Sequence, residues 1–170
     1  MSGRDVIAEL FTSIRNGFMV NLSDVTVPFS KLKLSVVKIL KDEGFIKYFE
    51  VNSLDDYRRV IKIGLKYAHD GSSVIRSIKR VSTPGRRIYV KKTDIPKVQR
   101  GFGICILSSS QGVVTGRVAR LANTGGELIG LVLFVFLAFV VFVFESWLLL
   151  VLYRGSKKVL GNPSLLRSVS

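Results

Sequence analysis

The apolar positions near the start of the chain recur with the spacing of a helix rather than that of a strand. They are Val6, Ile7, Leu10, Phe11 and Ile14. We therefore predict a helix over residues 2–15, with Ser2 as its cap and the pair Asn16-Gly17 as its end. One side of this helix is expected to face a core.

A second helical pattern lies at residues 31–43, between the capping residue Ser30 and the stop residue Gly44. The apolar side chains that we expect to be buried are Leu32, Val36, Ile39 and Leu40. The lysines that we expect on the opposite, solvated face are Lys31, Lys33, Lys38 and Lys41. The pattern thus predicts an amphipathic helix with a basic outer surface.

Elsewhere the apolar residues alternate with polar ones or form short runs, which is typical of strands. The strands that we predict are residues 45–51, 58–67, 74–82, 86–90, 103–109 and a last one from Glu127. Thr115 is expected to cap a short helix that ends near Leu121. A polar break at residues 68–73 is expected to divide an α/β domain, residues 1–70, from a β-rich domain, residues 71–132. The predicted fold class is α+β, with a small α/β N-terminal domain followed by a β-rich C-terminal domain.

The chain becomes almost wholly apolar towards its end. Residues 128–144 carry no charge, Glu145 interrupts the run, and residues 147–153 continue it before a basic flank that begins at Arg154. We predict a hydrophobic helix within residues 133–170. Three explanations stay open for it: a transmembrane anchor, a helix that docks on another protein, or a frameshift or read-through product.

The charge and the small number of cysteines and histidines limit the classes of function that fit this chain. The net charge is +14, and 22 of the 26 lysines and arginines precede residue 131, so the folded part is itself basic. Such charge favours a polyanionic partner, either nucleic acid or an anionic membrane surface. The single cysteine, Cys105, lies in an apolar run and excludes an internal disulfide, and the single histidine, His69, lies in a turn. We therefore expect neither an enzyme nor a metal or other cofactor.

An apolar run at residues 104–107 ends abruptly in three serines. Ser108, Ser109 and Ser110 are followed by Gln111 and Gly112, which read as a turn. Serine hydroxyls donate and accept hydrogen bonds, so they suit phosphates, riboses and base edges. The plainer alternative is an ordinary junction between a strand and a turn.

Five segments in order resemble the family of bacterial-type small-subunit ribosomal protein eight. They are residues 5–17 (DVIAELFTSIRNG), 28–46 (beginning PFSKLK and ending LKDEGFI), 80–89 (RVSTPGRRIY), 101–120 (GFGICILSSSQGVVTGRVAR) and 125–129 (GGELI). The resemblance covers residues 2–132. It departs from the usual family pattern at Val6, where proline is common, at Ser109, where threonine is common, and at Gln111, where lysine is common.

This resemblance implies a non-enzymatic protein that binds the central domain of small-subunit ribosomal RNA and assists subunit assembly. The residues that it places at the RNA are Ser108, Ser109, Ser110, Gly112, Gly126 and Glu127, with Tyr89, Lys31 and Arg86 as further candidates. Glu127 either accepts a hydrogen bond from RNA or orients a neighbouring arginine such as Arg86.

The other implied partners are neighbouring small-subunit proteins and the protein's own messenger RNA. The implied location is a bacterial cytoplasmic ribosome or an organelle-encoded equivalent, with membrane contact through the extension left open. The competing function is a membrane-anchored basic protein that binds anionic lipid or other polyanions.

Overall fold

The computed structural model describes residues 5–55 and 58–134, all within one compact unit. Helix α1 spans Val6–Met19, and the carboxylate of Asp5 caps it by accepting hydrogen bonds from the backbone N–H groups of Ile7 and Ala8, both at 3.1 Å. The cap is thus Asp5, not Ser2. The helix also continues through Gly17, which is buried. A Cβ at this position would collide with Val25 and Leu65, so no larger side chain fits there. Gly17 therefore permits close packing and does not end the helix.

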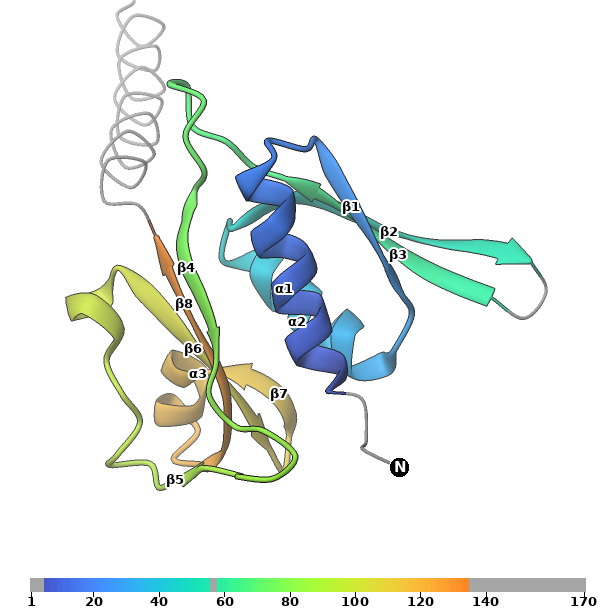
Figure 1. Cartoon of the computed structure of the whole chain (residues 1–170). Helices are drawn as coiled ribbons and strands as arrows, with labels where there is room; N and C mark the ends of the chain where they lie inside the picture. Colours follow the sequence, from blue (N-terminus) through green and yellow to red (C-terminus); the bar gives the residue numbers. More distant parts are fainter. Residues whose placement is uncertain (1–4, 56–57, 135–170) are drawn as a thin grey trace, which may run out of the picture. The chain divides into compact units, whose positions relative to one another are not determined.

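The first sheet is antiparallel and three-stranded, in the order β1-β3-β2. Its strands are β1 (Asp24–Pro28), β2 (Ile46–Asp55) and β3 (Arg58–Leu65), and helix α2 (Lys31–Asp42) connects β1 to β2. Helices α1 and α2 lie beside this sheet (Figure 1), and their buried side chains join those of β1 and β3 in one hydrophobic cluster.

The predicted buried face of α2 is partly wrong. Lys33 is almost completely buried, with 1% of its surface exposed, while Leu32 is 37% exposed. The ammonium of Lys33 lies 2.9 Å from the partly exposed carboxylate of Glu9 on α1, which compensates the buried charge. The face that packs inward therefore consists of Lys33, Val36, Val37 and Leu40.

The second sheet is antiparallel with β8 (Gly126–Phe134) at its centre. Strand β8 pairs with β4 (Ile75–Arg80), with the short β5 (Tyr89–Val90) and with β6 (Gly103–Ser109), and β6 pairs in turn with β7 (Gly112–Thr115). A 3₁₀ turn, Val98–Gly101, precedes β6. Helix α3 (Gly116–Leu121) follows β7, and the hydroxyl of Thr115 caps it as predicted.

The two sheets share one core. Its main cluster contains Phe11 of α1 and Ile63 of β3 together with Ile78, Ile106 and Ile129 of the second sheet. The predicted α+β class is confirmed, while the division at residue 70 stays a prediction.

Two arginines tie α1 to β4. Arg15 on α1 donates a hydrogen bond to the carbonyl of Ile78 at 2.7 Å, and Arg80 on β4 lies 3.2 Å from the carboxylate of Asp5. Because Asp5 also caps α1, the start of the helix is fixed against the second sheet.

The predicted hydrophobic helix lies outside the described residues, apart from Leu133 and Phe134, which belong to β8. Within residues 5–55 and 58–134, no helix is long and apolar enough to cross a membrane.

Candidate RNA-binding site

The serine-rich segment forms the hairpin between β6 and β7. Ser110 and Gln111 are the exposed turn residues, and Gly112 has φ +105°, a left-handed conformation that favours glycine. The hydroxyl of Ser109 donates to the carbonyl of Gly112 at 3.1 Å and accepts from the N–H of Gln111 at 3.2 Å. The role that the structure gives Ser109 is thus to hold the turn, while the Ser110 side chain is exposed.

Ser108 lies one position inside the hairpin and pairs with Glu127 across the β6–β8 ladder. Paired residues of antiparallel strands project on the same side of a sheet, so the Ser108 hydroxyl and the Glu127 carboxylate share one face. Gly126 permits this pairing, because a Cβ there would collide with the carbonyl oxygen of Ser108. Its role in the fold is therefore to let β8 approach β6 closely.

Glu127 is held by two side chains. One carboxylate oxygen accepts a hydrogen bond from the buried hydroxyl of Ser82, and the other lies 3.0 Å from the guanidinium of Arg87. The Glu127 side chain is only 15% exposed, whereas the side chain of Arg87 is 58% exposed. The ion pair thus joins a largely buried carboxylate to a guanidinium that reaches solvent. It involves Arg87 and not the predicted neighbour Arg86.

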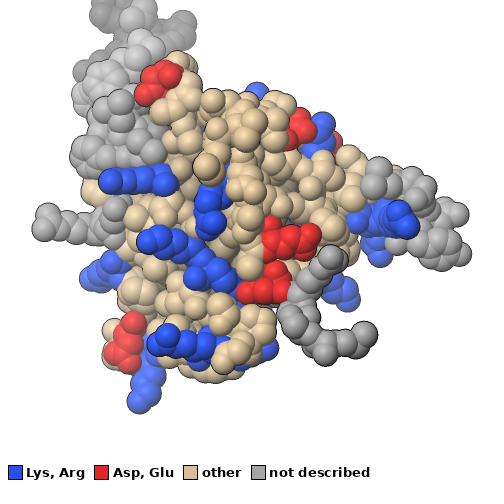
Figure 2. Space-filling view, viewed as in Figure 1, with Lys and Arg blue, Asp and Glu red and all other residues tan. Residues whose placement is uncertain are grey.

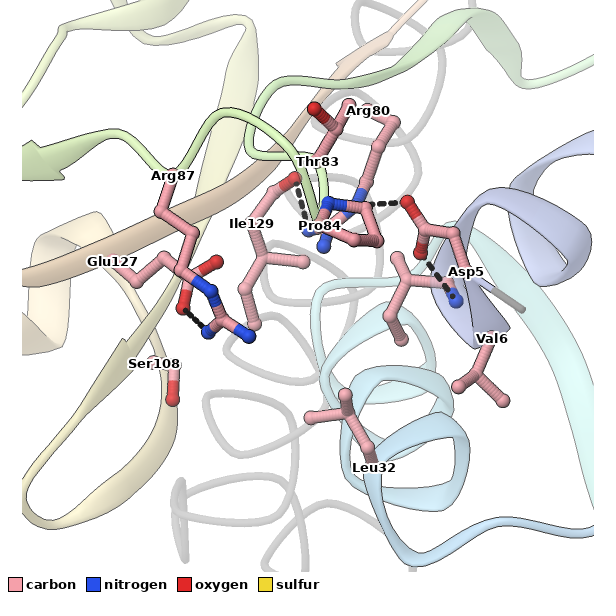
Figure 3. Close-up of a pocket in the computed structure, with 11 residues that line it drawn as sticks. Asp5, Val6, Leu32, Arg80, Thr83, Pro84, Arg87, Ser108, Glu127 and Ile129 are labelled. Atoms are coloured by element: carbon pink, nitrogen blue, oxygen red, sulfur yellow. Dashed lines mark hydrogen bonds and ion pairs between the residues drawn. The ribbon is translucent and has the colours of Figure 1, made fainter. Parts of the chain in front are cut away.

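These groups border a pocket of about 300 Å³. Ser108, Glu127 and Arg87 lie on one side of it, and Asp5, Val6 and Leu32 lie on the other (Figure 3). The turn that contains Thr83 and Pro84 also lines the pocket. Strands of the second sheet and both N-terminal helices therefore build a single concave site with hydroxyl, carboxylate and guanidinium groups.

The remaining predicted residues surround this pocket or lie outside its lining. Tyr89 in β5 pairs with Glu127 and is 68% exposed. Arg86 is exposed in the turn before β5, where its backbone bonds to that of Thr83. Lys31 is the exposed first residue of α2, next to the pocket residue Leu32. The structure thus brings Ser108 and Glu127 together with residues that sequence reasoning missed.

The missed residues are Asp5, Arg80, Ser82 and Arg87. Arg87 had no sufficient local signal, because its approach to Glu127 depends on the pairing of β5 with β8, which the sequence alone does not show. The link between Asp5 and Arg80 spans 75 positions of sequence and had no local signal.

Positive side chains surround the site. Figure 2 shows lysines and arginines spread over the β-rich half of this face, with a few carboxylates between them. Exposed cations in this half include Arg76, Lys79, Arg86, Lys91 and Lys92. Such a distribution provides the non-specific electrostatic attraction that nucleic acids require.

Metal-ligating side chains do not cluster among the residues that the structure describes. No group of three or more His, Cys, Asp or Glu side chains there is placed to hold a metal ion. Cys105 is buried, its thiol lies 3.5 Å from the carbonyl of Pro96, and burial raises the pKa of the thiol. A raised pKa keeps the thiol protonated near neutral pH, so it is a poor nucleophile.

Comparison with known proteins agrees with this geometry. Residues 5–133 match the family model described as ribosomal protein S8. The small ribosomal subunit protein uS8 of Pseudoalteromonas atlantica is 48% identical over 132 residues, which cover 78% of this chain and 99% of that relative. The protein of the same name from Pseudoalteromonas translucida is 50% identical, with the same coverage. The match to the family model ends at residue 133, so it gives no support to the apolar helix predicted beyond it.

Proposed function

Because this chain belongs to the ribosomal protein S8 family, whose members are structural, non-enzymatic components of the small ribosomal subunit, we propose that it binds the central domain of small-subunit ribosomal RNA and assists its folding during assembly. The observation that carries this proposal is the convergence of the Ser108 hydroxyl, the Glu127 carboxylate and the Arg87 guanidinium at one pocket beside an exposed serine turn. Structured RNA is recognised chiefly through its shape, its 2′-hydroxyls and its irregular regions. Short neutral hydroxyls on a rigid hairpin suit that kind of recognition.

In this proposal the hairpin provides specificity. Ser108 and Ser110 contact riboses or base edges directly. Ser109, Gly112 and Gly126 act through the backbone geometry that places the hairpin, and their exposed backbone groups add contacts. Glu127 accepts a hydrogen bond from RNA while Arg87 balances its charge, so the carboxylate does not simply repel phosphate.

The surrounding side chains provide affinity. Tyr89 is exposed enough to stack on a base, and Arg86 and Lys31 bind phosphates. The same surface would bind the protein's own message wherever that message imitates the ribosomal site. On the ribosome, bacterial or organellar, the exposed faces outside the pocket would contact neighbouring small-subunit proteins. The competing interpretation, a membrane-anchored lipid binder, finds no support in the comparisons.

The test replaces the two hydroxyls that are proposed to touch RNA. The full chain with Ser108→Ala and Ser110→Ala is titrated against a central-domain fragment of small-subunit ribosomal RNA and against a length-matched random duplex. We expect affinity for the fragment to fall roughly tenfold to a hundredfold, since each lost hydrogen bond is worth about 1 kcal/mol and each desolvated partner adds to that cost. Affinity for the duplex is expected to change less than about twofold, because it depends on the cations.

The matched control is Ser53→Ala, which removes an exposed serine of β2 that does not line the pocket. It is expected to bind both RNAs like the unaltered chain. Equal losses on fragment and duplex in the double variant would show that the serine hairpin does not read this RNA.

A further inference from the structure

Ser82 links the protein interior to the proposed recognition site. Its side chain is completely buried, its hydroxyl donates to one carboxylate oxygen of Glu127, and the same hydroxyl oxygen accepts from the N–H of Ile88 at 3.4 Å. We propose that Ser82 is a positioning residue for RNA recognition, which fixes the direction of the Glu127 carboxylate and, through it, of the Arg87 guanidinium. This inference rests on the proposed function, because it assigns Ser82 a role in that same site.

The backbone around Ser82 makes its hydroxyl a fixed point. The N–H of Ser82 donates to the carbonyl of Leu128 at 3.1 Å, and the N–H of Leu128 donates to the carbonyl of Ile88 at 2.8 Å. Both bonds are made by Leu128, the residue that follows Glu127 in β8, and they join it to the segment before β5. The backbone of Ser82 is thus held next to the backbone of β8 beside Glu127.

A glutamate without such an anchor would be poorly suited to this position. Its side chain has three rotatable bonds, and ordering it costs conformational entropy at the moment of binding. Its charge would also favour an orientation away from phosphate. The hydrogen bond from Ser82 restrains one oxygen before RNA arrives, so the cost of ordering is met during folding.

The restraint then passes to Arg87. Its guanidinium is planar and rigid, so a contact between Nη1 and Glu127 limits the directions in which the remaining N–H groups point. More than half of the Arg87 side chain is exposed, which leaves those donors accessible to a phosphate or a base edge. A buried hydroxyl thereby orients a cation at the surface.

The alternative is that Ser82 only fills space in the interior. A space-filling role would change stability and would affect every RNA alike. A positioning role would affect the RNA that the pocket recognises, would depend on the presence of Glu127, and would be rescued by another hydroxyl. The experiment measures these three differences.

The full chain carrying Ser82→Ala is titrated against the central-domain fragment and the random duplex at low and high salt. We expect affinity for the fragment to fall about tenfold, the loss that corresponds to one hydrogen bond to a charged group, and affinity for the duplex to change less than about twofold. Ser82→Thr retains the hydroxyl and is expected to recover most of the affinity. The matched control is Ser77→Ala, which truncates a half-buried serine of β4 in the same sheet.

The same titration in a Glu127→Ala background forms a double-mutant cycle. There Ser82→Ala is expected to cause little further loss, because the side chain whose oxygen accepts from Ser82 is already absent. If Ser82→Ala fails to fold, Ser82→Cys replaces it, since a thiol fills a similar volume but donates only weakly.

The outcomes separate this inference from the function on which it rests. If the unaltered chain binds both RNAs equally, the proposed function is overturned, and this inference with it. If the unaltered chain prefers the fragment and Ser82→Ala retains that preference, or if its effect adds fully to that of Glu127→Ala, only the positioning role is overturned.

Discussion

The ion pair between the two N-terminal helices, of which only the lysine is buried, leads to an asymmetric prediction about stability. Lys33 is 1% exposed and its ammonium lies 2.9 Å from Glu9, whose side chain is 39% exposed. Glu9→Gln leaves a buried ammonium without its counter-charge. Lys33→Met leaves a carboxylate that water can still reach. We therefore expect Glu9→Gln to destabilise the protein much more than Lys33→Met does.

The magnitudes follow from this difference in burial. Removing one partner of a buried ion pair costs about 3–5 kcal/mol, and we expect the lower end because the glutamine amide oxygen still accepts one hydrogen bond. Replacing the buried lysine with an apolar side chain of similar length is often neutral or stabilising, so we expect a change within about 1 kcal/mol. In a chain of this size, a loss of 3 kcal/mol lowers the melting temperature by roughly 10 °C.

Urea unfolding followed by circular dichroism measures both free energies on the full chain. The control is Lys38→Met, which changes an exposed lysine on the same helix and is expected to have almost no effect. A Lys33→Met variant that loses as much stability as Glu9→Gln would refute this reasoning. It would show that the charge of Lys33 itself contributes net stability.

The remaining predictions concern backbone packing and the thiol. Gly126→Ala is expected to lower the free energy of unfolding by about 1–3 kcal/mol, because the new methyl group meets the Ser108 carbonyl. Gly85→Ala is the control, since the space around Gly85 is open and the substitution should be tolerated. Thermal unfolding of both variants checks this. Cys105 is expected to react with a thiol reagent far more slowly in the native chain than in urea, because burial raises the pKa of its thiol. The fold favours the neutral thiol, so the stability that Cys105 contributes is fully present below the pKa of the unfolded chain, near 8.5. That stability is lost as the pH rises through the higher pKa of the folded chain. Free energies of unfolding that stay level between pH 8 and 10 would contradict this.

Local pattern predicted the elements that flank the proposed site. The strand at residues 103–109 and the cap at Thr115 agree with the structure, because an apolar run that ends in polar turn residues and a capping hydroxyl are local signals. Gly17 shows where such signals fail. Its conformation is helical, and the reason for glycine there is the approach of β1 and β3, which lie far along the chain.

Charge was the other source of error. On α2, a lysine at a core position was assigned to the solvent because its partner Glu9 lies on another helix, 24 positions earlier. The choice between Arg86 and Arg87 as the partner of Glu127 likewise depends on a residue far along the chain. Pairing across a sheet decides that choice, and a single sequence does not show the pairing.

The arrangement of the second sheet explains how polar recognition groups come to be rigid. Ile106 lies two residues before Ser108 on β6, and Ile129 lies two residues after Glu127 on β8, so each polar residue shares a sheet face with its buried neighbour. Both isoleucines belong to the cluster that packs against α1 and α2. Ser108 and Glu127 therefore continue the core face to the ends of these two strands, where the pocket opens. Their direction is set by the packing of the core, which is why substitutions beneath the surface, such as Ser82→Ala, are expected to alter recognition without touching RNA.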